Sequence, residues 1–335
     1  MPCSLSRRQV VACSIASATV LFLGLQQTSV IVLDDSFEME TELLRSPDIS
    51  NETGPYTVLI ATFRRDNCLI KAIPHYLTCN IAEVRVKWQD YKRPVPEWLQ
   101  KAAQEHPDRL AIDVADGDYL SSRFKVENLI GEAVFTVDDD ERFSCEYLRQ
   151  AFRLWRKTPN RLVGYSPRRL LDNGCYDAQA NYLSMYPTAN TLFVTKGAFF
   201  DPKYLKEYFS SKYDALRKMV DGNLTGEDIL MSYIVALNNP PGQRWVVPLY
   251  GGGIDEDFEC ASSRALSKLS ADSRCAIQHH FQSELGFPFE YTPWGDFYLW
   301  EKPAGTFLPF SASGHWAMPW YPLRMYLRFR RNRRH

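Results

Sequence analysis

The sequence predicts an α/β protein with a mostly parallel central sheet, preceded by one transmembrane helix. Two observations carry this prediction. Between residues 56 and 137, short β-branched runs alternate with segments of helical periodicity, which is the pattern of βαβ units. Ahead of them, residues 9–33 form a charge-free, mostly apolar stretch. As a helix this stretch would reach about 37 Å, enough to cross a bilayer core of about 30 Å.

The apolar stretch is expected to be an uncleaved signal anchor. Its nearest small-residue cleavage motif, at residues 16–18, lies inside the apolar run, whereas a signal peptide is cleaved after it. Arg7 and Arg8 precede the stretch and acidic residues follow it, so residues 1–8 should stay in the cytosol. This orientation predicts a single-pass type II protein of the Golgi or endoplasmic reticulum membrane, with a lumenal body.

Two further features fit a lumenal body. Asn51 and Asn223 each begin an acceptor motif for N-glycosylation. An even number of cysteines beyond the anchor permits disulfides, but the sequence leaves their pairing open. No two of them form a C-x-x-C pair, which argues against a zinc site. These cysteines are Cys68, Cys79, Cys145, Cys175, Cys260 and Cys275.

The body is expected to follow an acidic stem at residues 34–54. The predicted strands are residues 56–62, 83–88, 110–113, 133–137, 190–195 and 244–249. The predicted helices lie around residues 69–77, 98–102, 226–237 and 264–283. One apolar face of the third helix should pack on the sheet, and its residues are Ile229, Leu230, Tyr233, Ile234 and Leu237.

The last part of the chain, residues 286–335, is rich in aromatic residues and proline without a clear period. We expect a packed irregular extension of the domain at residues 55–285. From Arg324 to the end the chain is strongly basic, which suits either a solvated tail or a contact with a polyanion or anionic lipid. The formal net charge of -1 gives no overall field for nucleic acid, so no nucleic-acid partner is expected.

Three consecutive acids, Asp138-Asp139-Asp140, follow the predicted strand at residues 133–137. Ligands of open α/β sheets bind outside the carboxyl ends of the strands. Three carboxylates there repel one another unless a cation or water separates them, and Mg²⁺ or Mn²⁺ prefers such oxygen ligands. An acidic turn that only solvates the strand end is the other interpretation.

Glu227 and Asp228 open the third predicted helix. The helix macrodipole favours acids in a first turn, so a purely structural role is one interpretation of the pair. Arg65 and Arg123 lie beside predicted sheet ends, where guanidinium groups could hold phosphate oxygens. A solvated surface position is the alternative for each arginine.

Several segments, in order along residues 55–285, resemble the exostosin-like, family 64 glycosyltransferase domain. The resemblance rests on residues 56–65, 84–88, 122–124, 132–140, 162–168 and 226–236. It implies a GT-A fold and the retaining transfer of an N-acetylhexosamine, GlcNAc or GalNAc, from a UDP-sugar to a glycan or glycoconjugate acceptor with Mn²⁺.

The resemblance also implies roles for individual residues. The metal ligands would be Asp138 and Asp140, and the catalytic carboxylate would be Asp228. The residues that bind the nucleotide sugar would be Arg65, Gln89, Asp118, Arg123, Asp138, Asp139, Glu227 and Arg274.

The chain departs from the family pattern at four positions. Gln89 and Asp118 stand where asparagines are common, and Gly226 replaces a cysteine, which should leave Cys275 without its usual partner. Asp272 aligns with an expected arginine, for which Arg274 or Arg264 could substitute.

Three hypotheses follow from these observations. The first is an active UDP-sugar transferase. The second is a degenerate relative that binds a nucleotide or glycan without turnover, which the four departures suggest. The third is a lumenal glycan-binding or scaffold protein. The retention of so many mutually repelling acids favours the first.

Overall fold

The computed structural model describes residues 54–165, 167–168, 170, 174–175, 191–251, 254–256, 271–291 and 298–300. The predicted anchor at residues 9–33, nearly all of the stem and most of the C-terminal extension lie outside these residues. Within the described part of the chain, no helix combines the length and the apolar character needed to cross a membrane.

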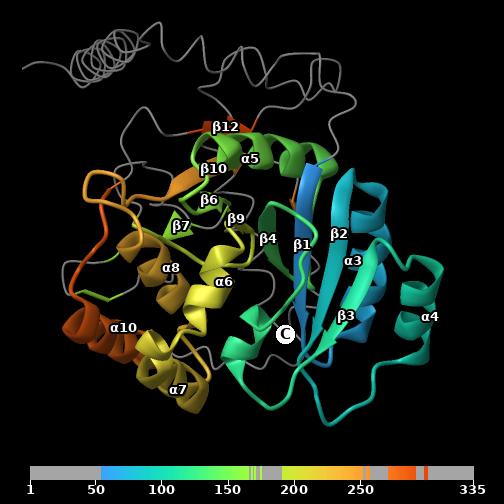
Figure 1. Cartoon of the computed structure of the whole chain (residues 1–335), viewed down its shortest axis with the longest axis horizontal. Helices are drawn as coiled ribbons and strands as arrows, with labels where there is room; N and C mark the ends of the chain where they lie inside the picture. Colours follow the sequence, from blue (N-terminus) through green and yellow to red (C-terminus); the bar gives the residue numbers. More distant parts are fainter. Residues whose placement is uncertain are drawn as a thin grey trace, which may run out of the picture. The chain divides into compact units, whose positions relative to one another are not determined.

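The centre of the fold is an eight-stranded sheet with the order β12-β10-β6-β9-β4-β1-β2-β3 (Figure 1). Neighbouring strands are parallel, except that β9 is antiparallel to both β4 and β6. The prediction of a mostly parallel sheet is therefore confirmed. The strands are β1 (Gly54–Thr62), β2 (Ile81–Trp88), β3 (Leu110–Val114), β4 (Ala133–Asp138), β6 (Val163–Gly164), β9 (Ala198–Phe200), β10 (Val247–Gly251) and β12 (Tyr298–Trp300).

Four shorter strands form two small antiparallel sheets. β5 (Glu141–Phe143) pairs with β11 (Ile254–Glu256), and β7 (Pro167–Arg168) pairs with β8 (Leu192–Phe193). The strand predicted at residues 190–195 is thus shorter than expected and does not join the main sheet. Conversely, β12 extends the main sheet from a segment that we expected to be irregular.

The helices are α3 (Asp66–Thr78), α4 (Glu97–Glu105), η1 (Leu120–Phe124), α5 (Cys145–Lys157), α6 (Lys203–Tyr208), η4 (Ser211–Tyr213), α7 (Asp214–Asn223), α8 (Glu227–Leu237) and α10 (Ala271–Leu285). Of these, α6, α7, α8 and α10 gather in one group, with α8 packed against α6, α7 and α10 (Figure 1). The late helix predicted at residues 264–283 corresponds to α10, whose described part begins at Ala271.

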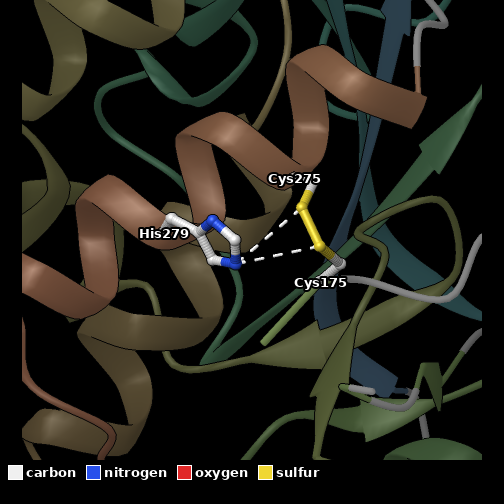
Figure 2. Close-up of side chains that lie close together, drawn as sticks. All are labelled: Cys175, Cys275 and His279. Atoms are coloured by element: carbon white, nitrogen blue, oxygen red, sulfur yellow. Dashed lines mark hydrogen bonds between the residues drawn. A yellow bond between two sulfur atoms is a disulfide. The ribbon is translucent and has the colours of Figure 1, made fainter. Parts of the chain in front are cut away.

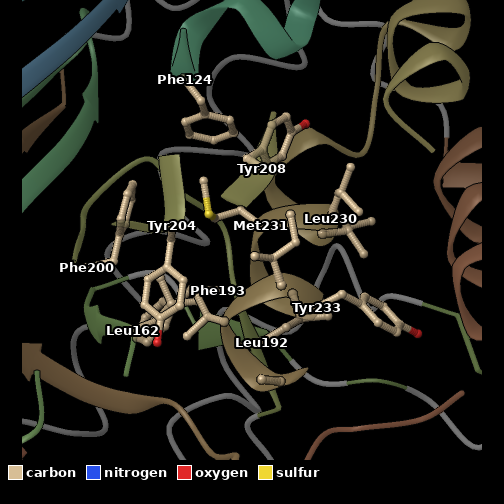
Figure 3. Packing of buried hydrophobic residues seen from close by; sticks show 14 of the residues in the cluster. Phe124, Leu162, Leu192, Phe193, Phe200, Tyr204, Tyr208, Leu230, Met231 and Tyr233 are labelled. Carbon is tan, nitrogen blue, oxygen red and sulfur yellow. The ribbon is translucent and has the colours of Figure 1, made fainter. Parts of the chain in front are cut away.

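Helix α8 lies inside the protein and not on its surface. The prediction of a single buried face is wrong, because the run from Ile229 to Ala236 is buried on every side. Its sequence has no polar face beyond Ser232, and a helix that is apolar all round is a core helix. The hydroxyl of Ser232 is satisfied there, since it donates to the carbonyl of Phe193 at 3.0 Å. Figure 3 shows the aromatic and aliphatic side chains that surround α8.

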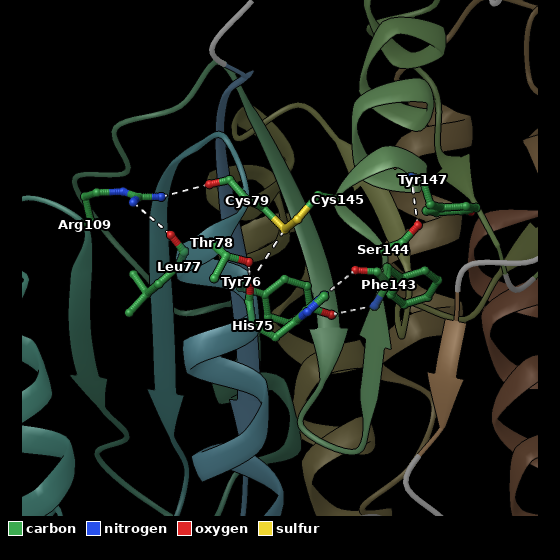
Figure 4. Close-up of a disulfide and its surroundings, with 10 residues drawn as sticks. All are labelled: His75, Tyr76, Leu77, Thr78, Cys79, Arg109, Phe143, Ser144, Cys145 and Tyr147. Atoms are coloured by element: carbon green, nitrogen blue, oxygen red, sulfur yellow. Dashed lines mark hydrogen bonds between the residues drawn. A yellow bond between two sulfur atoms is a disulfide. The ribbon is translucent and has the colours of Figure 1, made fainter. Parts of the chain in front are cut away.

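A disulfide between Cys79 and Cys145 ties the end of α3 to the start of α5 (Figure 4). Hydrogen bonds from α3 surround it. Tyr76 donates its hydroxyl proton to the carbonyl of Glu141 at 3.0 Å and accepts the N–H of Phe143 at 3.2 Å. These contacts hold β5, which directly follows the acidic triplet, against α3.

Candidate active site

One edge of the main sheet collects the chain segments that carry the predicted site residues. The parallel strands β1, β2, β3 and β4 all end at this edge, where ligands of α/β proteins bind. Because β9 runs the opposite way, it begins at the same edge.

Burial divides the acidic triplet. Asp138 ends β4, and Asp139 and Asp140 form the turn that leads into β5. Asp138 and Asp140 keep 28% and 16% of their side-chain surface accessible, whereas Asp139 is completely buried. Asp139 accepts a hydrogen bond from the Thr62 hydroxyl at 2.5 Å.

Arg65 connects the end of β1 to the triplet. Its guanidinium lies 2.5 Å from a carboxylate oxygen of Asp139 and 3.0 Å from one of Asp140. Burial raises the pKa of Asp139 to about 7, although Arg65 and Thr62 act against this rise. Burial and the charge of Asp138 likewise raise the pKa of Asp140. Asp139 and Asp140 therefore hold protons more readily than exposed acids do.

Arg123 joins the triplet to α8. Its Nη2 donates to Asp138 at 2.7 Å, and its Nη1 donates to Glu227 at 3.2 Å. Burial works to raise the pKa of Asp138, but Arg123, Arg65 and Lys196 together lower it below the usual range. Arg123 is itself buried on η1.

Gly226 determines how α8 begins. Its φ of +90° lies in the left-handed region that favours glycine, and a Cβ there would lie 2.8 Å from Cγ2 of Ile277 on α10. The next two residues, Glu227 and Asp228, start the helix next to Arg123. Burial and the charge of Asp228 raise the pKa of Glu227 to about 7, against the effect of Arg123.

Asp228 lies between opposing influences. Burial raises the pKa of Asp228. The positive charge of Arg274 acts most strongly to lower this pKa, and the hydrogen bond that Asp228 accepts from the N–H of Ile229 at 2.8 Å also acts to lower it. Arg274 thus lies near enough to Asp228 to act on it. Arg264, the other candidate, is outside the described residues.

Gln89 and Asp118 occupy different surroundings. Gln89 is buried and donates to the hydroxyl of Ser122 at 3.2 Å, so it lies beside Arg123 on η1. Asp118 lies in the segment after β3, is 43% exposed and forms an ion pair with Lys92 at 2.7 Å. The structure brings the other predicted residues into one cluster, whereas Asp118 stands at its rim.

Cys275, whose usual partner is replaced by Gly226, forms a disulfide with Cys175 instead (Figure 2). The bond joins the segment at residues 174–175 to α10, so the missing cysteine at Gly226 is replaced by one from another part of the chain. His279 brings Nε2 to 3.8 and 3.9 Å from the two sulfur atoms. Zinc binds thiolates, and a disulfide supplies none.

Two basic residues near the site escaped prediction. Lys196 lies before β9 and acts on Asp138 and Asp140, and the buried Arg168 on β7 acts on Asp228. Residues 162–168 carried the family resemblance without suggesting a role for Arg168. No local motif marks Lys196, since only the pairing of β9 with β4 brings it to the triplet.

The donor set suits a divalent cation. Asp138 and Asp140 offer partly accessible carboxylate oxygens at a strand end, and oxygen ligands are those that Mg²⁺ and Mn²⁺ prefer. The cations around them already offset part of their charge, and a metal ion would offset more.

Known proteins resemble this chain over the segment that builds the site. The glycosyl transferase family 64 domain matches residues 56–284, more than half of the chain. The glycosylinositol phosphorylceramide mannosyl transferase 1 of Arabidopsis thaliana is 30% identical over 263 residues, which cover 73% of this chain and 76% of that protein. Human exostosin-like 2 is 27% identical over 189 residues, which cover 54% of this chain and only 57% of that protein.

Among solved structures, the mannosyltransferase PcManGT from Pyrobaculum calidifontis, in complex with GDP-Man and Mn²⁺, matches with a TM-score of 0.39 and 15% identity. The match covers 60% of this chain and 58% of that one, and a TM-score below 0.5 supports no conclusion about this chain. The family match and the plant relative are decisive on their own: the chain belongs to glycosyl transferase family 64 and is a glycosyltransferase.

Proposed function

We propose that this protein is a metal-dependent, retaining glycosyltransferase with a GT-A fold. It takes an N-acetylhexosamine, GlcNAc or GalNAc, from a UDP-sugar and transfers it to a glycan or glycoconjugate. Residues 55–285 form the catalytic domain, and residues 9–33 anchor it in the Golgi or endoplasmic reticulum membrane with the domain in the lumen.

One observation carries the catalytic part of this proposal. Arg123 bonds to Asp138 at the end of the sheet and to Glu227 at the start of α8. Acids suited to a metal and acids suited to a sugar therefore meet around one buried guanidinium. Such a convergence serves a ligand that has a diphosphate at one end and a sugar at the other.

The metal would be held by Asp138 and Asp140. When bound, Mn²⁺ would act as a Lewis acid that neutralises the charge developing on the leaving diphosphate. Arg65, paired with Asp139 and Asp140, and Arg123 would bind the nucleotide and the donor beside it. Gln89, next to η1, and Asp118, at the rim, would contact the nucleoside.

In the transfer itself, the bond between the anomeric carbon and the β-phosphate oxygen breaks, and its electron pair stays on that oxygen. The acceptor hydroxyl oxygen bonds to the anomeric carbon and gives its proton to the released diphosphate. Asp228 would stabilise the positive charge on the sugar in between, the demand that glycoside hydrolases also meet with a carboxylate. Glu227 would orient the sugar, and Arg274 would assist from α10.

Transfer of mannose is a second candidate. A 30% identical relative is named a mannosyl transferase, and the chain has Gln89 and Asp118 where the resemblance to the exostosin-like domain leads us to expect asparagine. A donor pocket altered at these two positions could accept a different nucleotide sugar.

A donor panel distinguishes these candidates. UDP-GlcNAc, UDP-GalNAc and GDP-mannose are each incubated with the purified protein and Mn²⁺, and release of nucleoside diphosphate is measured with and without EDTA. We expect release from a UDP-N-acetylhexosamine that EDTA abolishes. Release from GDP-mannose alone would favour the mannosyl candidate. Binding of a nucleotide without any release would indicate a degenerate relative.

A further inference from the structure

Lys196 lies at the ligand-binding edge of the sheet, across from the acidic triplet. It belongs to the turn at residues 195–197, immediately before β9. β9 runs antiparallel to β4, with Ala198 opposite Thr136. Continued by two residues, the same register brings Lys196 opposite Asp138.

A buried acid holds the Lys196 side chain in this position. Its ammonium group forms an ion pair with the carboxylate of Glu141, whose side chain is only 5% exposed. Glu141 opens β5, and its carbonyl accepts the hydroxyl proton of Tyr76 at 3.0 Å. The Lys196 side chain is 26% exposed, so its charge is fixed in place and still within reach of a ligand.

The charge of Lys196 reaches the two accessible acids of the triplet. Burial works to raise the pKa of both Asp138 and Asp140, and Lys196 acts against this rise in each case. Arg65 also lowers the pKa of both acids, and Arg123 lowers that of Asp138, while each arginine is shared between two carboxylates. Lys196 is therefore a third cation of the same site, and it comes from a different segment of the chain.

We propose that Lys196 binds the diphosphate of the donor and stabilises the charge that the diphosphate gains as the sugar leaves. This inference rests on the proposed function. An ammonium group carries three N–H donors, so it can bond to Glu141 and to a phosphate oxygen together. When the electron pair of the broken bond stays on the β-phosphate oxygen, a cation already fixed beside that oxygen lowers the barrier.

Nucleotide binding in EDTA tests this role without metal and without turnover. Lys196→Met alone would leave the buried Glu141 carboxylate without this ion pair, so the informative variant is Lys196→Met combined with Glu141→Gln. We expect it to weaken the binding of UDP about 10- to 100-fold, the scale for a lost hydrogen bond to a charged group. Glu141→Gln alone should leave the Kd of UDP nearly unchanged, because Lys196 remains.

Direct titration of Mn²⁺ without nucleotide gives an independent readout. The double variant should bind Mn²⁺ more tightly than Glu141→Gln alone, because the two variants differ only in the cation beside Asp138 and Asp140. Lys196→Arg should behave nearly like the wild type in both titrations. Lys203→Met is the matched control, since Lys203 is a half-exposed lysine just after β9 that pairs with Asp201 at 3.0 Å.

Two results would overturn the role of Lys196 while the proposed function stands. One is tight UDP binding by the wild type with an equal Kd in the double variant. The other is an equally large loss of UDP affinity in Lys203→Met, which would show that removing any lysine charge weakens binding and that Lys196 has no specific role. A wild-type protein that binds neither UDP nor GDP would overturn the proposed function, and this inference with it.

Discussion

Arg123 donates a hydrogen bond from Nη1 to Oε1 of Glu227 at 3.2 Å, which joins side chains 104 positions apart in the sequence. Nη2 of the same guanidinium donates a hydrogen bond to Asp138. The edge of the sheet and the start of α8 therefore form one charged unit. A change in charge at one end of this unit should therefore affect the other end.

The stability of the protein should depend on the proton held by Glu227. Its pKa is about 7 in the folded protein and 4.5 in the unfolded chain. Between these values the folded state binds more protons, so the free energy of unfolding falls as the pH rises. Glu227→Gln lacks this proton equilibrium and should gain on the order of 2 kcal/mol relative to the wild type from pH 4.5 to 7.

Urea unfolding at several pH values checks this prediction. Glu97→Gln serves as the control, because Glu97 is an exposed acid in the first turn of α4. It should unfold in parallel with the wild type at every pH. If Glu227→Gln does so as well, the carboxyl group of Glu227 does not carry the pH dependence.

The different burial of Asp139 and Asp140 predicts different outcomes for these neighbouring acids. Asp140→Asn should keep the fold and lose the Mn²⁺-dependent gain in UDP affinity, because a proposed metal ligand is gone. Asp139→Ala should lower the free energy of unfolding by about 1–3 kcal/mol, because the buried hydroxyl of Thr62 loses its hydrogen-bond acceptor. Calorimetric titration and urea unfolding measure the two effects, with the exposed Asp108→Asn as the control. Equal loss of stability in both variants would contradict this division of roles.

Substitutions at the two acids that open α8 should have different effects, one on turnover and the other on donor binding. Asp228→Asn should keep UDP and Mn²⁺ binding but lower kcat at least ~100-fold, the scale for one lost charged contact in the transition state. Glu227→Gln should mainly raise the KM for the donor. If Asp228 only serves the helix dipole, its variant would instead lose about 0.3–1 kcal/mol of stability with normal turnover. Asp214→Asn, in the first turn of α7, shows the size of that structural effect.

Gly226 offers a test of how α8 begins. Gly226→Ala should lower the free energy of unfolding by about 1–2 kcal/mol, because its left-handed backbone disfavours a Cβ, and the Cβ would also crowd Ile277. Gly222→Ala on α7 is the matched control, since no atom lies within 4 Å of its added Cβ. It should raise the free energy of unfolding by roughly 0.5–1 kcal/mol. A neutral effect of Gly226→Ala would contradict the strained start of α8.

The long strands could be predicted from the sequence, and the short ones could not. β1 and β4 are runs of mainly β-branched and apolar residues, and β2 alternates such residues with charged ones, so their local sequence is enough to mark them. β9 has only three residues, and its place between β4 and β6 depends on pairing with distant segments. The antiparallel position of β9, which brings Lys196 to the site, therefore could not be predicted from the local sequence.

The candidate site, too, could be predicted from the sequence only in part. Asp138–Asp140 and Glu227-Asp228 are visible as acidic clusters at the ends of recognisable elements. That Asp139 is buried while Asp138 and Asp140 stay partly accessible depends on the turn between β4 and β5 and on Thr62, which lies 77 positions from Asp139. The disulfide between Cys175 and Cys275 likewise joins residues 100 positions apart, and sequence spacing alone could not choose that pair.

The disulfide between Cys79 and Cys145 makes a covalent ring of the chain between them, a separation of 66 residues. This ring contains β2, β3, η1, β4 and the whole acidic triplet, whereas α8 and α10 lie outside it. By the chain-entropy relation, closing a loop of this length disfavours the unfolded state by about 4 kcal/mol. The disulfide between Cys175 and Cys275 closes a second ring of 100 residues, and this one contains α8. A reducing agent should therefore lower the protection from hydrogen exchange on both sides of the site, in β4 and in α8 alike.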